Sequence, residues 1–371
     1  VNDALNDADV TGAQADTAPK VQAIVDGFNA ILANADGTVN NATNPTQANY
    51  SAIGVSGVDT VQEVTLLGDV IDGKAAGDVD TVSKVQTLAD AVQAVMNGNP
   101  TEAQLVALGV TGVSSANLSS VQAALAAAVD ATELNTLAGL QAVVTEAINA
   151  LAAIEAAAQN NNATATTPSL AQYDALGVIG VTAQNLASVN DALNDADITG
   201  AQADTAAKVQ AIADGFIAIL ANATDASAAN PTQSNYAAIG VNGVDTAQEV
   251  SLLGDVIDGK APADVDSVSK VQTLADAVQA VMNGNPTEAQ LAALGITGVT
   301  SANLSSVQAA LAAAVDATEL TSLTGLQTVV TAAVNALAAI ETAAQGNTAT
   351  ATTPSAAQYD ALGVTGVTED N

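Results

Sequence analysis

Apolar side chains recur at steps of three and four residues along most of the chain, which is the spacing of one face of an α-helix. For example, Val85, Leu88, Val92 and Val95 would lie on one side of a single helix. The alternation of apolar and polar residues that indicates strands is missing from the pattern. The sequence therefore predicts an all-α fold.

A short segment that opens with proline returns six times and reads NPTEAQLVALGVTGV at residues 99–113. Its prolines are Pro45, Pro100, Pro168, Pro231, Pro286 and Pro354. Each is followed by a Tyr or Leu after five residues and by glycines after nine and twelve residues. We expect a short helix with the proline in its first turn, capped by the preceding Asn or Thr. The first glycine should end this helix in the left-handed conformation, and the Tyr or Leu should pack in the core.

The spacing of these prolines shows two levels of repetition. Successive prolines lie 55, 68, 63, 55 and 68 residues apart, so a unit of about 60 residues is nested in a superrepeat of 186 residues. The two superrepeats are nearly identical: SKVQTLADAVQAVMNGNPTEAQL starts at residue 83 and again at residue 269. Repetition at this period indicates a tandem array.

Each unit contains a short, a middle and a longer apolar helical pattern, which predicts a small three-helix bundle. The chain would then be an array of such modules, about 55–68 residues each, in two copies of a three-module superrepeat, stacked as an elongated rod or filament. The predicted boundaries are 1–43 (helices 2 and 3 of a partial module c), 44–98 (module a), 99–166 (module b), 167–229 (module c), 230–284 (module a), 285–352 (module b) and 353–371 (helix 1 of a partial module c).

Polar residues before the apolar patterns indicate where the other helices begin. Asp16 is the expected N-cap of the helix that contains Pro19, and Asp59 is expected to cap a middle helix whose inward face includes Val61. Ser114 or Ser115 should cap the middle helix of module b.

The charge of the chain narrows the classes of partner. There are 39 acidic residues, six lysines and no arginine or histidine, which gives a net charge of −33. Nothing can neutralise phosphates, so nucleic acid is excluded as a partner and anionic membranes are disfavoured. The Ala-rich stretch after Leu140 is interrupted by Glu146 and Glu155, so we expect no insertion into a membrane.

The side chains available for chemistry are few. Without His, Cys or Arg, no catalytic or cofactor-binding residues can be assigned, and we expect no enzyme. Lys74 is interpreted as a solvated loop lysine beside acidic neighbours. Paired aspartates in interhelical loops are the candidate ligands of weakly bound calcium: Asp78, Asp80, Asp264 and Asp266. Calcium needs six to eight oxygens, so the same residues can also be read as helix caps and surface charge.

The last predicted segment, 353–371, supplies the helix that segment 1–43 lacks. One interpretation is that the chain is part of a longer array of the same repeats. The other is that copies of the chain associate head to tail by completing the split module, and a contact of this kind that does not close into a ring forms a filament.

The recurring pattern [N/T]-P-x-x-A-x-[Y/L]-x-A-[L/I]-G-[V/I]-x-G-V, followed by an Ala/Val helix, resembles the helical repeats of very large cell-surface adhesins and biofilm-matrix proteins of proteobacteria. The resemblance covers nearly the whole chain. It implies an extracellular structural protein that serves as a stalk or a self-assembling fibre for adhesion or matrix formation. The alternative is a repeat-built binding module, either calcium-dependent and similar to a surface layer or an array that binds a ligand.

Overall fold

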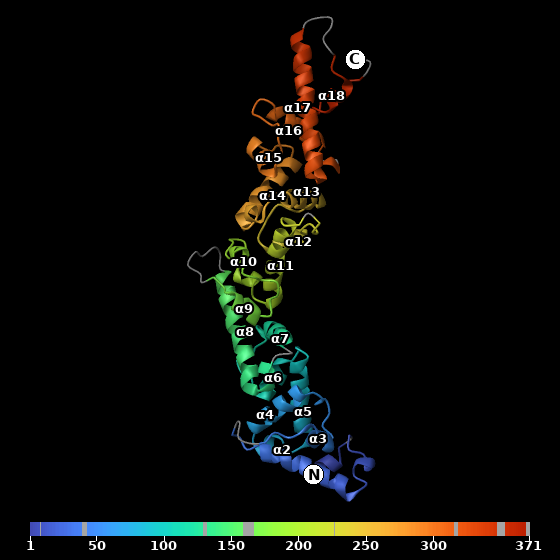
Figure 1. Ribbon diagram of the computed structural model, residues 1–371, viewed down its shortest axis with the longest axis vertical. Helices are drawn as coiled ribbons and strands as arrows, with labels where there is room; N and C mark the ends of the chain where they lie inside the picture. The colour runs from blue at the N-terminus through green and yellow to red at the C-terminus, as the bar shows by residue number, and fades with distance from the viewer. Residues whose placement is uncertain are drawn as a thin grey trace. The chain divides into compact units, whose positions relative to one another are not determined.

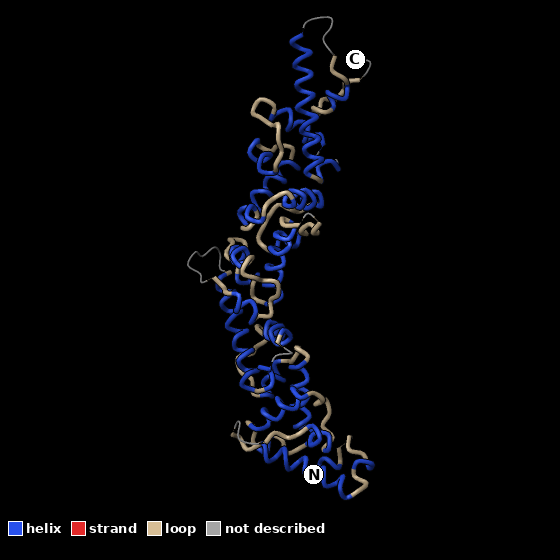
Figure 2. The backbone as a smooth tube through the Cα atoms, in the orientation of Figure 1, coloured by secondary structure: helices blue, strands red, loops and turns tan. Residues whose placement is uncertain are grey.

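The computed structural model describes residues 1–7, 9–38, 43–128, 132–158, 167–225, 227–314, 318–346 and 353–368. Over these residues the predicted all-α fold is confirmed, because the elements are helices and no strand is present (Figure 2). One isolated β-bridge joins Asp36 and Ala75.

Three kinds of helix follow one another along the described chain (Figure 1). The middle helices are α1 (Asn2–Leu5), α4 (Val61–Asp72), α7 (Leu118–Ala127), α10 (Leu186–Leu193), α13 (Ala247–Asp258) and α16 (Leu304–Ala314). The long helices are α2 (Ala18–Asn34), α5 (Val82–Met96), α8 (Leu137–Ala157), α11 (Ala206–Asn222), α14 (Val268–Met282) and α17 (Leu323–Gly346). The short helices are α3 (Gln47–Ala52), α6 (Glu102–Leu108), α9 (Leu170–Ala175), α12 (Gln233–Ala238), α15 (Glu288–Leu294) and α18 (Ala356–Asp360).

A 3-10 turn precedes each long helix. These turns are η1 (Gly12–Gln14), η2 (Ala76–Asp78), η3 (Thr132–Asn135), η4 (Gly200–Gln202), η5 (Pro262–Asp264) and η6 (Thr318–Thr321). They change the direction of the chain between a middle and a long helix in a few residues.

The short helices begin later than the sequence predicts. The N-cap of α6 is Thr101, the residue after Pro100, so the proline lies outside the helix. Thr101 Oγ1 accepts the backbone N–H of Gln104 at 3.2 Å, and Gln104 Oε1 accepts the N–H of Thr101 at 2.8 Å. This reciprocal capping box gives partners to two N–H groups at the start of the helix. The same box opens the other five short helices.

The predicted glycine turn at the end of each short helix is confirmed. Gly109 ends α6 with φ of 100°, and Gly112 follows with φ of 87°. Both values lie in the left-handed region, which costs an L-residue with a Cβ about 1–2 kcal/mol. All twelve glycines of this pattern have positive φ.

The predicted caps of the other helices are wrong by one to three residues. Thr60, not Asp59, caps α4, because Glu63 Oε2 accepts the Thr60 N–H at 2.8 Å in a capping box. Val61 is then the first residue of the helix and is 83% exposed instead of buried. The remaining N-caps are Asn117 for α7, in place of Ser114 or Ser115, and Thr17 for α2, in place of Asp16.

The apolar stripes of the long helices form the core. In α8, Leu140, Val144 and Ile154 are fully buried, as their spacing predicts. Tyr50, Tyr173 and Tyr236 are also fully buried, which confirms their predicted place in the core, whereas Tyr359 is half-buried.

Short helices pack against the long helix that precedes them: α3 on α2, α6 on α5 and α9 on α8 (Figure 1). The approach of α2 to α3 is close, since a Cβ added to Gly27 would lie 2.6 Å from the backbone oxygen of Asn49. The predicted boundaries, by contrast, group each short helix with the helices that follow it. Those boundaries stay a prediction, but the packing favours groups of a middle, a long and a short helix.

Contacts divide the chain into two compact units. The first contains Val1–Ala157, Thr166–Ile179 and Gly200–Val209, and the second contains Gly180–Thr199 and Gln210–Asn371. In the described residues, Leu137–Ala157 and Leu323–Ala344 are long and apolar enough to cross a membrane. Such helices are also found in the cores of proteins outside membranes, and the apolar stripe of α8 is buried against its neighbours.

Candidate functional site

A recurring contact is a hydrogen bond in which a side chain on a middle helix accepts a backbone N–H at the start of the second long helix that follows it. Asp69 lies on α4, and one of its carboxylate oxygens accepts the backbone N–H of Leu137, the first residue of α8, at 2.6 Å. We call such a bond a forward cap, because the side chain of an earlier helix caps a helix that begins 68 to 86 residues later.

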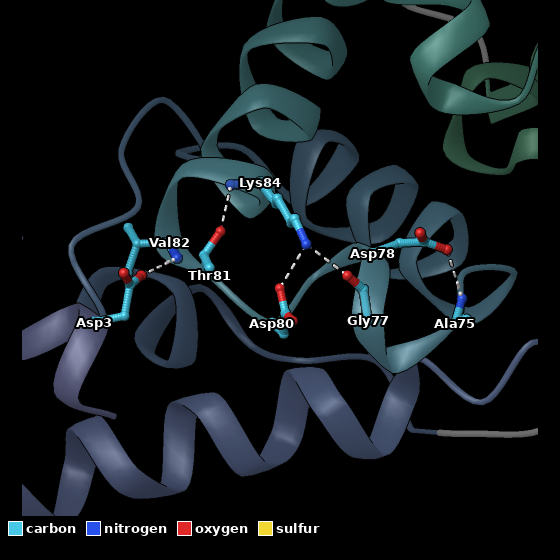
Figure 3. A network of polar contacts seen from close by, with 8 residues as sticks. All are labelled: Asp3, Ala75, Gly77, Asp78, Asp80, Thr81, Val82 and Lys84. Atoms are coloured by element: carbon cyan, nitrogen blue, oxygen red, sulfur yellow. Dashed lines mark hydrogen bonds and ion pairs between the residues drawn. The ribbon is translucent and has the colours of Figure 1, made fainter.

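Five forward caps are present in the described residues, each within one compact unit. They run from Val82 N–H to Asp3 (2.7 Å), from Leu137 N–H to Asp69 (2.6 Å), from Ala206 N–H to Ser120 Oγ (3.0 Å), from Val268 N–H to Asp191 (2.7 Å) and from Leu323 N–H to Asp255. Figure 3 shows the first of them, in which the Asp3 carboxylate reaches the N–H of Val82.

A forward cap completes a helix start that is already half capped. Thr81, the residue before α5, accepts the N–H of Lys84 with its hydroxyl at 3.3 Å, which serves the third residue of the helix. Asp3 serves the first residue, Val82. The first N–H groups of a helix have no partner inside it, and they carry partial positive charge that favours a carboxylate. The N-terminus of α5 is therefore capped both by Thr81, the residue before it, and by Asp3 of α1.

The acceptor is a carboxylate in four forward caps and a hydroxyl in one. Asp69 is 9% exposed, and Ser120 is 1% exposed. A hydrogen bond to a charged group contributes about 1.5–3 kcal/mol, and one between neutral groups contributes about 0.5–1.5 kcal/mol. The forward cap made by Ser120 is accordingly the weakest of the five by this measure.

A lysine braces the turn that leads into four of the long helices. In the turn before α5, Lys84 Nζ donates to the backbone oxygen of Gly77 at 2.7 Å and pairs with Asp80 at 2.7 Å (Figure 3). Lys20, Lys208 and Lys270 make the equivalent pairs. In α8 the corresponding residue is Gly139, where an added Cβ would lie 1.9 Å from the backbone oxygen of Glu133. The tight η3 turn thus replaces the lysine brace.

The candidate calcium ligands lie in these braced turns. Asp78 accepts the N–H of Ala75 at 3.2 Å, and Asp80 faces Lys84, so the two carboxylates point to different partners (Figure 3). Asp264 and Asp266 repeat this arrangement with Ala261 and Lys270. Among the described residues, no group of three or more His, Cys, Asp or Glu is placed to hold a metal. Calcium binding at these four residues stays a prediction.

Lys74 takes part in packing and is not a solvated loop lysine. It is half-buried, and its Nζ donates to the backbone oxygen of Ala107, near the end of α6, at 2.7 Å. Lys260 makes the same bond to Ala293 at 2.6 Å. A cation is favourable at the C-terminus of a helix, where carbonyl groups lack partners.

Sequence reasoning missed the forward caps. Their signal was an aspartate or serine on the buried side of a middle helix, such as Asp69 between Leu67 and Val70. A polar residue at such a position needs a partner, but the spacing does not reveal that the partner is a backbone N–H in a later helix.

Comparison of the chain with models of protein families, with curated proteins and with solved structures finds no match.

Proposed function

We propose that the chain is the structural repeat region of an extracellular bacterial surface protein, where it acts as a stalk or a self-assembling fibre for adhesion or for building a matrix. The observation that carries this proposal is the series of forward caps, in each of which a side-chain oxygen of one helix accepts a backbone N–H at the start of a later helix. A repeated bond between helices of successive repeats supports a one-dimensional array, since each repeat then contacts mainly its neighbours.

In this proposal the middle, long and short helices form three-helix bundles, and the bundles stack into an elongated rod. A bundle of about 60 residues buries little apolar surface by itself. The forward caps and the shared apolar faces supply the missing stabilisation. A copy of the chain is the proposed partner at each end of the rod, and neither catalysis, nucleic acid nor membrane insertion has a part in the role.

The composition supports this role. A net charge of −33 keeps separate chains apart until specific contacts form. With six lysines and no arginine, the chain offers few cleavage sites to proteases that cut after basic residues. Both properties suit a protein exposed outside the cell.

Two measurements test the proposal. Small-angle X-ray scattering of the purified chain should give a radius of gyration well above about 21 Å, the value for a compact protein of this length. A value near that of a compact protein would refute the rod. Antibodies against the chain should label intact cells of the organism that encodes it, and labelling only after permeabilisation would refute the surface location.

A further inference from the structure

The forward cap made by Ser120 lies inside the first compact unit, and its surroundings define a joint in detail. Ser120 Oγ, on α7, accepts the N–H of Ala206, the first residue of α11, at 3.0 Å. Both residues are buried, with exposed fractions of 1% and 5%. Next to them α8 packs against η4, and Ala203 and Val209 are fully buried. We call this arrangement the serine joint.

The acceptor half of the serine joint occurs a second time, in the second compact unit. Ser306 on α16 is the counterpart of Ser120, 186 residues later in an identical LSSVQAALAA segment. Ser306 is only half-buried. On α17, Leu337 and Ile340 are half-buried, whereas their counterparts Leu151 and Ile154 are 6% and 0% exposed. This face is thus apolar and partly uncovered.

The donor half also occurs a second time, at the start of α2. Residues 12–24 repeat residues 200–212 with a single difference, Pro19 in place of Ala207. Ala18, the counterpart of the buried Ala206, is exposed. Ala15 and Val21 are half-buried, while their counterparts Ala203 and Val209 are fully buried. The backbone N–H of Ala18 is thus the counterpart of the Ala206 donor.

We propose that a second copy of this chain docks on the first by forming a serine joint between them, in which Ser306 Oγ of one copy accepts the N–H of Ala18 of the other. The inference rests on the proposed function and names the residues through which copies associate. It needs no new geometry, because the same residue types already meet in the joint between Ser120 and Ala206.

The chemistry of the serine joint suits association between separate chains. Four of the five described forward caps use a carboxylate, and a carboxylate loses its hydration when it enters an interface. A serine hydroxyl costs less to desolvate. The contact joins two different faces, so a pair of chains linked by one joint still has one unused face on each chain, and association continues into a filament.

The test measures association of the full 371-residue chain by sedimentation velocity at increasing concentration, in about 0.5 M NaCl to screen the negative charge. Ala18→Pro removes the N–H and adds two ring carbons, at the helix position where proline is best tolerated. Ser306→Ala removes only the acceptor. Each change should weaken association by about threefold to tenfold. Because both break the same bond, Ser306→Ala should cause no further weakening in a chain that already carries Ala18→Pro.

Matched controls use neighbouring residues that are exposed in both copies of the sequence. Ser305→Ala, whose counterpart Ser119 is exposed, should leave association unchanged. Ala18→Arg should abolish association by steric clash, whereas Ala23→Arg should have no effect, because Ala23 and its counterpart Ala211 are both exposed.

Additive effects of Ala18→Pro and Ser306→Ala on association would overturn the proposal. So would control variants that weaken association as much as these two changes do, or a chain that stays monomeric up to about 1 mM. These outcomes leave the array itself intact. A separate variant, Ser120→Ala, tests the internal joint through unfolding, so failure of the docking proposal and failure of the proposed function can be told apart.

Discussion

The carboxylate of Asp69 on α4 accepts the backbone N–H of Leu137 on α8 at 2.6 Å, across 68 residues of sequence. Between the two residues the chain runs through α5, α6 and α7. The bond therefore ties together helices that belong to successive repeats, and it makes the start of the long helix in one repeat depend on the repeat before it.

Removing this carboxylate should destabilise the first compact unit. We expect Asp69→Ala to lower the free energy of unfolding by about 2 kcal/mol, because it leaves the N-terminus of α8 with one fewer partner. Asp69→Asn keeps an acceptor and should cost about half as much. The control is Asp90→Ala on the exposed side of α5, which should change stability by less than about 0.5 kcal/mol. Urea unfolding followed by circular dichroism measures all three, and equal losses for Asp69→Ala and Asp90→Ala would contradict the forward cap.

The buried tyrosines predict loss of stability at alkaline pH. Burial raises the pKa of Tyr50, Tyr173 and Tyr236 well above the usual value of about 10. In the unfolded chain these phenols ionise at the usual pKa, so above it the unfolded state binds fewer protons than the folded state. Stability is therefore complete below about pH 10 and falls by about 1.4 kcal/mol per pH unit for each tyrosine above it. Unfolding measured from pH 8 to pH 11 should show this slope.

The hydroxyl groups of Tyr50 and Tyr236 are buried without a hydrogen-bond partner in the described residues. Tyr50→Phe and Tyr236→Phe should therefore raise stability by about 1 kcal/mol each at neutral pH, because a desolvated hydroxyl is removed. The double variant should also lose about two thirds of the alkaline slope expected for the three tyrosines. A lower stability at neutral pH would show that the hydroxyls have partners.

Gly177 should tolerate no side chain. Its φ is 73°, and an added Cβ would lie 2.7 Å from the backbone oxygen of Ala123 on α7. We expect Gly177→Ala to cost at least about 2 kcal/mol, from backbone strain together with the displaced contact. Gly12→Ala is the control, since nothing lies within 4 Å of its Cβ position and the conformation is not left-handed. Thermal unfolding should separate the two variants by several degrees, and similar melting temperatures would disprove the close approach.

The lysine braces should contribute little to stability. The side chains of Lys84 and Asp80 are 48% and 52% exposed, and exposed ion pairs are worth about 0–1 kcal/mol. Lys84→Met should lower stability by less than about 0.5 kcal/mol at 0.15 M salt. A loss above about 2 kcal/mol would mean that the brace is required for the turn.

Calcium should act on the chain mainly as a screening ion. A calcium ion at Asp78 and Asp80 would have to displace Lys84 and the N–H of Ala75. We expect equal melting temperatures in calcium chloride and in sodium chloride of the same ionic strength. A rise specific to calcium, lost in Asp78→Asn and Asp80→Asn, would instead support a calcium-dependent array.

The sequence was sufficient for the helices and their apolar faces, because the three- and four-residue steps act locally. Leu140, Val144 and Ile154 are buried as predicted, and Gly109 takes the left-handed turn. Helix starts were less predictable. Thr101 and Gln104 form a capping box whose N-cap lies two residues after the predicted Asn99, and Thr60 with Glu63 forms one whose N-cap lies one residue after Asp59.

The forward caps could not be predicted, because packing between distant segments decides which backbone N–H lies beside each acceptor. Nothing near Asp69 in sequence indicates that the N–H of Leu137 lies beside it. The preference of α3 for α2, rather than for the helices after it, likewise depends on the close approach at Gly27. Local pattern defines each helix, while contacts across 20 or more residues define its neighbours.

Every forward cap in the described residues has its acceptor on the N-terminal side of its donor. A ribosome therefore releases Asp3 before Val82, and Asp69 before Leu137. Each of these five long helices emerges when the side chain that caps it is already in place, so the chain can fold in the order of its synthesis. The direction of the caps thus allows a long array to grow one folded repeat at a time, and none of these helix N-termini waits for a cap that has yet to be made.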